Sequence, residues 1–224
     1  METLQLTGEM SNRIVSEIMN VPDAYLVLDA VQKALDEERK RRLKFYNDIT
    51  EQEKTEFING KIVVHSPVKM KHNKASLRLA QLMNIYVCKQ NMGFVGIEKI
   101  MITLTRNDYE PDICFFRKDK AMTFTTDQIL FPTADLVVEV LSTSTEARDR
   151  GVKFDDYQAH GIEEYWIVDP ENETLEQYHL IDEKYELILK APSNDVKSFV
   201  IEGFQIPIRA IFDDAENLKA IQNL

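Results

Sequence analysis

The sequence predicts an α/β protein in which helices flank a mixed β-sheet. Residues 135–141 form a nearly continuous apolar run, which is typical of a central strand covered on both faces. Residues 113–116 and 165–168 are further strand-like apolar runs. A helical pattern separates the runs at 135–141 and 165–168, and this strand–helix–strand order predicts a crossover unit.

The first third of the chain is predicted to contain an extension, a long helix and a hairpin. Residues 1–20 are weakly patterned, whereas apolar residues recur near helical spacing over residues 24–45. The basic cluster from Arg39 to Lys44 has two interpretations, a solvated helix face or a contact with phosphate. Residues 57–64 are expected to form two short strands, because Asn59-Gly60 is a strong turn signal between them.

The remaining elements follow from the same periodicities. A helix at residues 72–90 has one apolar face and ends at Asn91-Met92-Gly93. The capping-box spacing of Thr143 and Glu146 begins a second helix, which runs to about His160. Further strands are expected at residues 94–97, 100–104, 175–179, 185–189, 199–201 and 204–208, a polar connection at 117–132, and a final helix near Ala215.

Composition limits the classes of protein to which this chain can belong. With 224 residues, of which 44% are hydrophobic, it can bury one sizeable core. We expect an N-terminal extension over residues 1–50 and one globular domain over residues 51–224. The net charge of −11 is not that of a protein that coats itself with nucleic acid. A nuclease stays open, because a local basic cleft or bound cations can reverse the local field.

The compartment is expected to be the cytoplasm. Cys88 and Cys114 lie in apolar contexts without metal-ligand spacing, as buried cysteines of a reducing compartment do. No apolar run approaches the roughly 18 residues that a membrane span requires, so no membrane partner is expected. The first eight residues lack the basic flank and apolar core of a secretion signal.

Two acidic residues in apolar strand patterns are the best indication of function. Asp112 directly precedes the run at 113–116, and Glu139 lies inside the run at 135–141. A carboxylate in a buried strand is costly unless a charge meets it. Such carboxylates suit a hard cation such as Mg²⁺, and the backbone carbonyl of Val140 is a candidate third ligand. The competing interpretations are a turn-proximal cap for Asp112 and a structural ion pair for Glu139.

A lysine follows on the next predicted helix. Asp149, Lys153 and Tyr157 are spaced four residues apart and would share one helix face. Lys153 could orient a water molecule or stabilise developing charge during phosphodiester hydrolysis. A plain surface ion pair of Asp149 and Lys153, with Tyr157 packed beside it, is the alternative.

The residues around these positions resemble the Uma-type restriction endonuclease family, which belongs to the PD-(D/E)XK nuclease superfamily. The resemblance covers residues 55–212 and is weaker over the first 50 residues. The motifs that carry it are Glu110-Pro111-Asp112, the run from Asp135 to Ser142, Asp149-Arg150-Gly151-Val152-Lys153, and Tyr157 with Gly161 and the run from Glu164 to Pro170. Glu56-Phe57-Ile58-Asn59-Gly60, Ser66-Pro67, His72 and Gly203-Phe204-Gln205-Ile206-Pro207 also match.

The resemblance implies a restriction-endonuclease-like core, to which the tail adds C-terminal β-hairpins. It implies metal ligation by Asp112 and Glu139. In the wider superfamily the catalytic lysine lies two residues after the acidic residue, where this chain has Leu141, so Lys153 would supply the lysine from the following helix. Glu56 and His72 are additional candidates, and each could instead be a local structural residue.

Two functional hypotheses follow. The first is an endonuclease that depends on Mg²⁺ or Mn²⁺ and hydrolyses nucleic acid, with DNA as the expected substrate. The second is a non-catalytic binding or scaffold module that retains the nuclease fold, because a fold does not dictate a function. A homodimer is a further expectation, since the apolar run Phe199-Val200-Ile201 could supply an interface.

Overall fold

The computed structural model describes residues 8–50 and 53–224. Residues 1–7, which begin the weakly patterned segment, and residues 51–52, where the main domain is expected to start, lie outside the described part. The chain forms two compact units. The first contains the residues up to His65 together with Leu104–Tyr109, and the second contains Ser66–Thr103 and Glu110–Leu224. The expected division after residue 50 stays a prediction.

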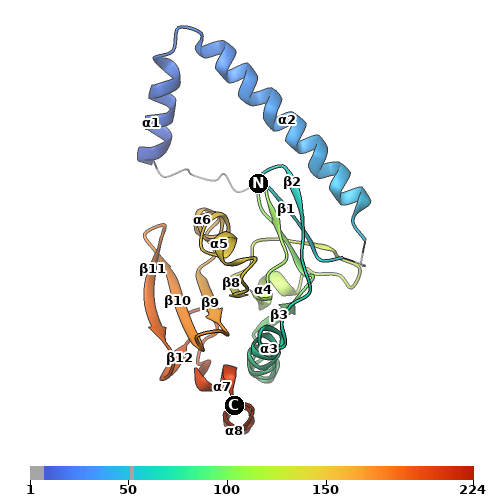
Figure 1. The fold of residues 1–224 in the computed structure, drawn as a ribbon, viewed down its shortest axis with the longest axis vertical. Coiled ribbons are helices and arrows are strands. Elements are labelled where there is room, and N and C mark those ends of the chain that lie inside the picture. Colours follow the sequence, from blue (N-terminus) through green and yellow to red (C-terminus); the bar gives the residue numbers. More distant parts are fainter. Residues whose placement is uncertain (1–7, 51–52) are drawn as a thin grey trace. The chain divides into compact units, whose positions relative to one another are not determined.

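The first unit combines two helices with short antiparallel strands (Figure 1). The expected hairpin is present: Ile58 pairs with Lys61 across Asn59 and Gly60, whose positive φ angles of 49° and 77° suit a tight hairpin turn. Phe57 pairs on its other side with Asp108. The elements of this unit are α1 (Gly8–Met19), α2 (Ala24–Asp48), β1 (Thr55–Ile58), β2 (Lys61–Val64) and β5 (Asp108–Tyr109).

An ion pair attaches helix α2 to strand β5. The guanidinium of Arg42 donates to both carboxylate oxygens of Asp108, over 2.7 and 2.6 Å, and Tyr46 donates its hydroxyl to Asp108 Oδ1 over 2.8 Å. The side chain of Asp108 is fully buried, so this pairing compensates a carboxylate that would otherwise be costly. Arg42 therefore has a structural role that neither interpretation of the basic cluster anticipated.

A six-stranded mixed sheet forms the centre of the second unit. The strand order is β11-β10-β9-β8-β6-β3. Strands β8 and β9 pair in parallel, as the predicted crossover requires, and the other neighbours are antiparallel. The strands are β3 (Gly93–Ile97), β6 (Ile113–Arg117), β8 (Leu136–Val140), β9 (Glu164–Asp169), β10 (Thr174–Ile181) and β11 (Lys184–Ala191).

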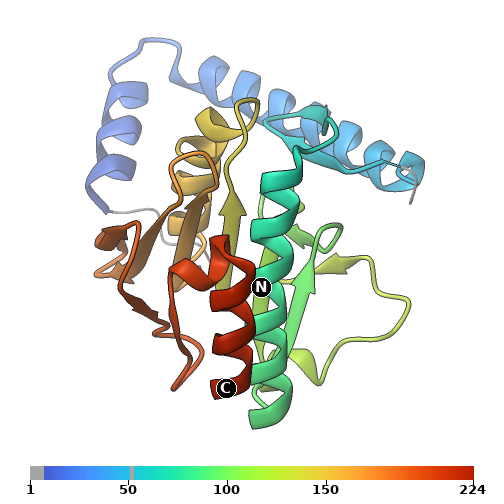
Figure 2. The same ribbon diagram turned by 60° about the horizontal axis from the view of Figure 1, so that its bottom comes forward.

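Helices and further short strands complete this unit. Helix α3 (Met70–Gln90) lies beside the C-terminal helices α7 (Arg209–Phe212) and α8 (Asp214–Asn223) (Figure 2). Within the described residues, no helix is both long and apolar enough to cross a membrane. The other elements are β4 (Met101–Thr103), α4 (Lys118–Ala121), β7 (Leu130–Phe131), α5 (Glu146–Asp149), α6 (Val152–Ala159), β12 (Asp195–Lys197) and β13 (Gln205–Pro207).

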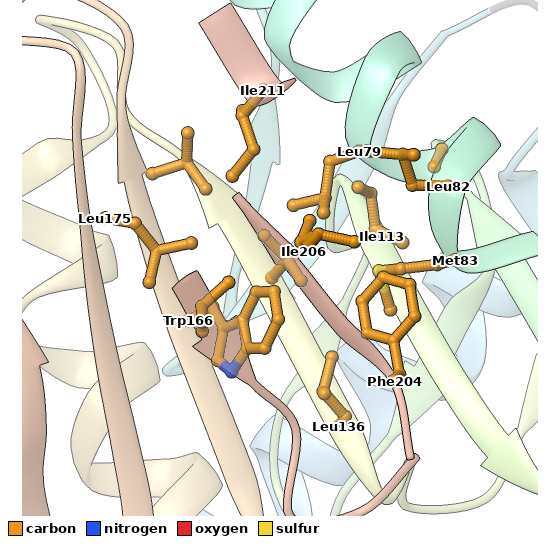
Figure 3. Packing of buried hydrophobic residues seen from close by; sticks show 14 of the residues in the cluster. Leu79, Leu82, Met83, Ile113, Leu136, Trp166, Leu175, Phe204, Ile206 and Ile211 are labelled. Atoms are coloured by element: carbon orange, nitrogen blue, oxygen red, sulfur yellow. The ribbon is translucent and has the colours of Figure 1, made fainter. Parts of the chain in front are cut away.

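The alternation of side chains along β8 separates the core from the candidate site. Leu136, Val138 and Val140 belong to the hydrophobic cluster that α3 covers. Because successive strand residues point to opposite faces, Glu139 leaves the sheet on the other side, toward α5 and α6. The apolar core thus fixes the face on which the carboxylate lies. The same cluster contains Leu79, Leu82 and Met83 of α3 with Trp166 and Phe204 (Figure 3).

Two elements predicted from the sequence are wrong. The single helix expected from Thr143 to about His160 is two helices, α5 and α6, which break at Arg150 and Gly151. A Cβ at Gly151 would lie 2.8 Å from the carbonyl oxygen of Ala147, so this close backbone approach suits glycine. The strand expected at residues 199–201 is a turn-like segment, whose backbone is held by a side chain instead of a neighbouring strand.

That side chain is the carboxylate of Glu164, the first residue of β9. Glu164 Oε2 accepts hydrogen bonds from the backbone N–H groups of Phe199 and Val200 and from Ser198 Oγ. Burial raises the pKa of Glu164, while the hydrogen bonds from Ser198, Gln177 and Trp166 act in the opposite direction. Sequence periodicity cannot distinguish a buried strand from a buried turn that is satisfied in this way.

Candidate active site

Strands β6 and β8 bring the two predicted carboxylates together. The antiparallel register pairs Ile113 with Val138, and extending it by one residue sets Asp112 opposite Glu139. Asp112 is 6% exposed and Glu139 is 3% exposed. The backbone N–H of Val140 donates to Asp112 Oδ2 over 2.8 Å. Asp112 therefore reaches the strand that carries Glu139.

Helix α6 supplies two donors to Glu139. Lys153 Nζ lies 3.0 Å from Glu139 Oε1, and the hydroxyl of Tyr157 donates to the same oxygen over 2.8 Å. Lys153 is 1% exposed and Tyr157 is fully buried. Hydrogen bonds to charged groups in such surroundings are short and strong, so they hold the carboxylate in one orientation. The alternative of a plain surface ion pair is excluded for Lys153.

Asp149 contacts Lys153 although the two residues belong to different helices, α5 and α6. Its Oδ1 lies 3.5 Å from Lys153 Nζ, and both side chains are 1% exposed. The hydroxyl of Tyr165 on β9 donates to the backbone carbonyl of Asp149 over 3.0 Å. Burial, followed by the charges of Glu139 and Asp149, raises the pKa of Tyr165 well above its ordinary value. Tyr165 therefore stays protonated and remains a hydrogen-bond donor to α5.

His72 contacts Asp112 from helix α3. Its Nε2 is 3.3 Å from Asp112 Oδ2, and the residue is 5% exposed in the first turn of α3. Within the described residues its buried Nδ1 has no hydrogen-bond partner. His72 thus joins the candidate site through Asp112, which the sequence left undecided.

Glu56 belongs to the first unit and contacts a residue of that unit. His65 Nε2 lies 2.9 Å from Glu56 Oε2 across the hairpin of β1 and β2. Glu56 is fully buried. Glu56 stays an additional candidate, while the group formed in the second unit consists of Asp112, Glu139, Asp149 and Lys153.

The donor atoms of this group suit a hard divalent cation. Asp112 and Glu139 provide carboxylate oxygens from opposed strand positions, and Val140 provides a backbone carbonyl on the strand of Glu139. Three buried carboxylates stand beside the single buried ammonium of Lys153, so the group, which includes Asp149, is net negative. No cluster of three or more His, Cys, Asp or Glu side chains in the described part of the chain is arranged to hold a metal. A set of two carboxylates and one backbone oxygen, as predicted from the sequence, would be a ligand set of a different kind.

The contacts that hold α5 against the sheet could not be found in the sequence. Arg150, at the break between α5 and α6, forms a bidentate ion pair with Glu176 of β10, with both N···O distances 2.9 Å. Burial alone would raise the pKa of Glu176, but hydrogen bonds from Arg150, Tyr178 and Lys190 outweigh it and lower the pKa to about 2. Arg150 lies inside a motif that resembles the Uma-type family, and this resemblance is the sequence signal that could have pointed to the residue. Its partner is 26 residues away, and no local pattern connects the two.

Comparisons with known proteins identify the family of the chain. The family model Uma2, described as “Putative restriction endonuclease”, matches residues 21–209. Two uncharacterized proteins of Synechocystis are similar: one is 32% identical over 168 residues, which is 72% of this chain and 85% of that protein. The other is 26% identical over 138 residues, which is 61% of this chain and 77% of that protein.

A solved structure shares the fold. It is the crystal structure of a protein from Anabaena variabilis that is described as a putative nuclease of the DUF820 family. The TM-score is 0.66 at 19% sequence identity, over 78% of this chain and 98% of that one. The family model covers most of the chain and includes every residue of the group around Glu139, and the chain therefore belongs to the Uma2 family of putative restriction endonucleases.

Proposed function

We propose that this protein is a divalent-metal-dependent endonuclease that hydrolyses phosphodiester bonds in nucleic acid, with DNA as the expected substrate. The observation that carries the proposal is the buried contact of Lys153 with Glu139, on the strand that Asp112 reaches. Membership of the Uma2 family and a fold shared with a structure described as a putative nuclease support it.

The residues of the site have distinct proposed roles. Asp112, Glu139 and the carbonyl of Val140 would hold Mg²⁺ or Mn²⁺. The bound cation would act as a Lewis acid on the phosphate and would lower the pKa of a bound water. The N–H of Val140 fixes Asp112, and Tyr157 fixes Glu139, so the oxygen ligands are oriented before substrate arrives.

Lys153 would contribute positive charge where negative charge develops on the phosphate. Its ammonium is held between Glu139 and Asp149, at 3.0 and 3.5 Å, so Asp149 is a positioning residue for the lysine. His72, which contacts Asp112 Oδ2, would restrict the orientation of that carboxylate. Glu56 is a candidate without a defined role.

Metal binding is the first test. We expect calorimetric titration of Mn²⁺ and Mg²⁺ to show binding to the wild type at millimolar concentration or below, and Glu139→Gln to weaken it at least tenfold, because a neutral amide is a poor ligand for a hard cation. Asp155→Asn is the matched control, since it removes one carboxylate from the exposed face of the same helix as Lys153. Absence of binding by the wild type would contradict the proposal.

Cleavage is the second test. Labelled single- and double-stranded DNA and RNA are incubated with Mg²⁺ or Mn²⁺, and the wild type is compared with Asp112→Asn, Glu139→Gln and Lys153→Met. We expect each variant to lose activity and Asp155→Asn to retain it. A wild type that binds metal and nucleic acid without cleaving the nucleic acid would support the non-catalytic module instead. Sedimentation equilibrium tests the expected homodimer separately.

A further inference from the structure

Arg148 is a charged side chain near the candidate site without a partner in the described protein. Its Nε is buried and makes no hydrogen bond within the part of the chain that the structure describes. Nor does an ion pair connect its guanidinium to a described carboxylate, in contrast to the cations around it. A buried guanidinium N–H without an acceptor is costly, and such groups in native proteins call for a specific explanation.

Other arginines of this chain show how the guanidinium is normally satisfied here. Arg150, two residues later, binds Glu146 and Glu176. Arg78 and Arg117 each bind an aspartate. Arg148 lies among the same acidic residues of α5 and binds none of them, so no carboxylate in the described part of the chain neutralises its charge.

The position of Arg148 narrows the kind of ligand. Arg148 directly precedes Asp149 in the chain, and the carboxylate of Asp149 lies 3.5 Å from Lys153 Nζ. The Cα atom of Arg148 is therefore one peptide unit away from that of a residue in the candidate active site. In the loop before Arg148, which follows strand β8, two hydroxyl groups lie within hydrogen-bond distance of a third. Ser142 Oγ lies 3.1 Å from Ser144 Oγ and 3.0 Å from Thr145 Oγ1. Hydroxyl and guanidinium groups together suit an anion with several acceptor oxygens.

Electrostatics favour phosphate as that anion. The chain has a net charge of −11, and the group formed by Asp112, Glu139, Asp149 and Lys153 is itself net negative. A nucleic acid approaching this site needs a cationic group that is not already neutralised by a protein carboxylate. Arginine supplies such a group with a planar fork that matches phosphate oxygens.

We propose that Arg148 binds a backbone phosphate of the nucleic-acid substrate, next to the phosphate that the group around Glu139 would hydrolyse. The inference deepens the proposed nuclease function and rests on it. Arg148 is a substrate-binding residue in this scheme, and the hydroxyl groups of the Ser142–Thr145 loop lie at the same end of strand β8.

Binding without cleavage tests the inference. Fluorescence anisotropy of labelled single- and double-stranded oligonucleotides in EDTA, over a series of NaCl concentrations, compares the wild type with Arg148→Ala and Arg148→Lys. Loss of one charged hydrogen-bonding contact should weaken binding roughly 5- to 30-fold at low salt. The slope of log K against log salt should fall by roughly 0.9 for duplex DNA or 0.7 for single strands. Arg148→Lys should keep the slope and lose part of the affinity.

Lys219→Ala is the matched control, because it removes one positive charge from the exposed side of helix α8 at the other end of the second unit. It should leave affinity and salt slope unchanged.

Equal slopes for Arg148→Ala and the wild type would overturn the inference, as would absence of nucleic-acid binding by the wild type. The metal titration is independent of Arg148, so the nuclease proposal can survive that outcome. Thermal unfolding of Arg148→Ala should occur at the wild-type temperature or slightly above it, since the variant loses no described partner and no longer buries an unpaired N–H.

Discussion

Glu139 illustrates how a charged residue can occupy the middle of a central strand. Its neighbours Val138 and Val140 face the hydrophobic core, and the alternation of the strand directs Glu139 to the opposite face. There Lys153 and Tyr157 both donate to Oε1. A buried ion pair is weak evidence of stability in itself, because desolvation offsets much of the attraction. Its presence in an otherwise apolar strand is better explained by the chemistry proposed for the site.

Removing the ammonium of Lys153 should show how much it stabilises the two carboxylates that it contacts. In Lys153→Met, Glu139 and Asp149 lose the ammonium that both contact, and we expect a loss of about 3 kcal/mol in the free energy of unfolding at pH 8. Urea denaturation at pH 8 measures this loss. The exposed control Lys219→Met should change stability by less than about 0.5 kcal/mol, and an equal loss in both variants would refute the argument.

The short helices α5 and α6 hold the site together. Asp149 ends α5 and Lys153 lies in the first turn of α6, and the break between them still leaves the two side chains in contact. The bidentate pair of Arg150 with Glu176 attaches this break to strand β10. We therefore expect the position of Lys153 to depend on an ion pair with β10, a different strand from the one that carries Glu139.

The Arg150–Glu176 pair should make stability depend on pH in a defined window. The pKa of Glu176 in the folded protein, about 2, lies below its ordinary value, so its contribution is present above about pH 4.5 and is lost as the pH falls toward 2. Glu176→Gln should lower the free energy of unfolding by on the order of 2 kcal/mol at pH 7. This difference from the wild type should shrink as the pH decreases through that window.

Urea titrations between pH 2.5 and 7 would measure the difference directly. Glu186→Gln, at an exposed position of β11, is the control and should behave as the wild type at every pH. A difference between Glu176→Gln and the wild type that stays constant down to pH 2.5 would show that the ionisation of Glu176 is not linked to folding.

Across the whole molecule, the negative charge of the chain and of its candidate site is unfavourable for nucleic-acid binding. A net charge of −11 opposes the approach of nucleic acid, and the buried carboxylates around Glu139 add to the local negative field. A divalent cation at Asp112 and Glu139 would reduce this field where substrate must bind. Metal binding should therefore strengthen substrate binding and should also stabilise the folded chain.

The size of the stabilisation by a bound metal can be predicted. A ligand that binds the folded state alone adds about 2.7 kcal/mol at 100 times its Kd, which for a chain of this length raises Tm by roughly 5–10 °C. Differential scanning fluorimetry with Mn²⁺ should show this increase for the wild type and little change for Asp112→Asn. NaCl at matched ionic strength separates specific binding from screening. An equal increase in Asp112→Asn would place the bound metal elsewhere.

Local signals in the sequence are sufficient for much of the fold. The Asn59-Gly60 turn, the apolar run of β8 and the crossover from β8 to β9 are short-range patterns, and the structure confirms all three. The break at Gly151 and the turn at residues 199–201 escape such patterns, because each depends on a contact that the local periodicity does not show. For Gly151 this is the close approach to Ala147, and for residues 199–201 it is the carboxylate of Glu164.

The family, the sheet class and the residues that a metal-dependent nuclease would use can all be inferred along the chain, since residue type and strand periodicity are local properties. Folding is what brings Lys153 to Glu139, His72 to Asp112 and Arg150 to Glu176. Folding also leaves Arg148 without a partner in the described chain. These relations join residues on different elements, and their energies depend on burial and distance, which are defined only when the chain has folded.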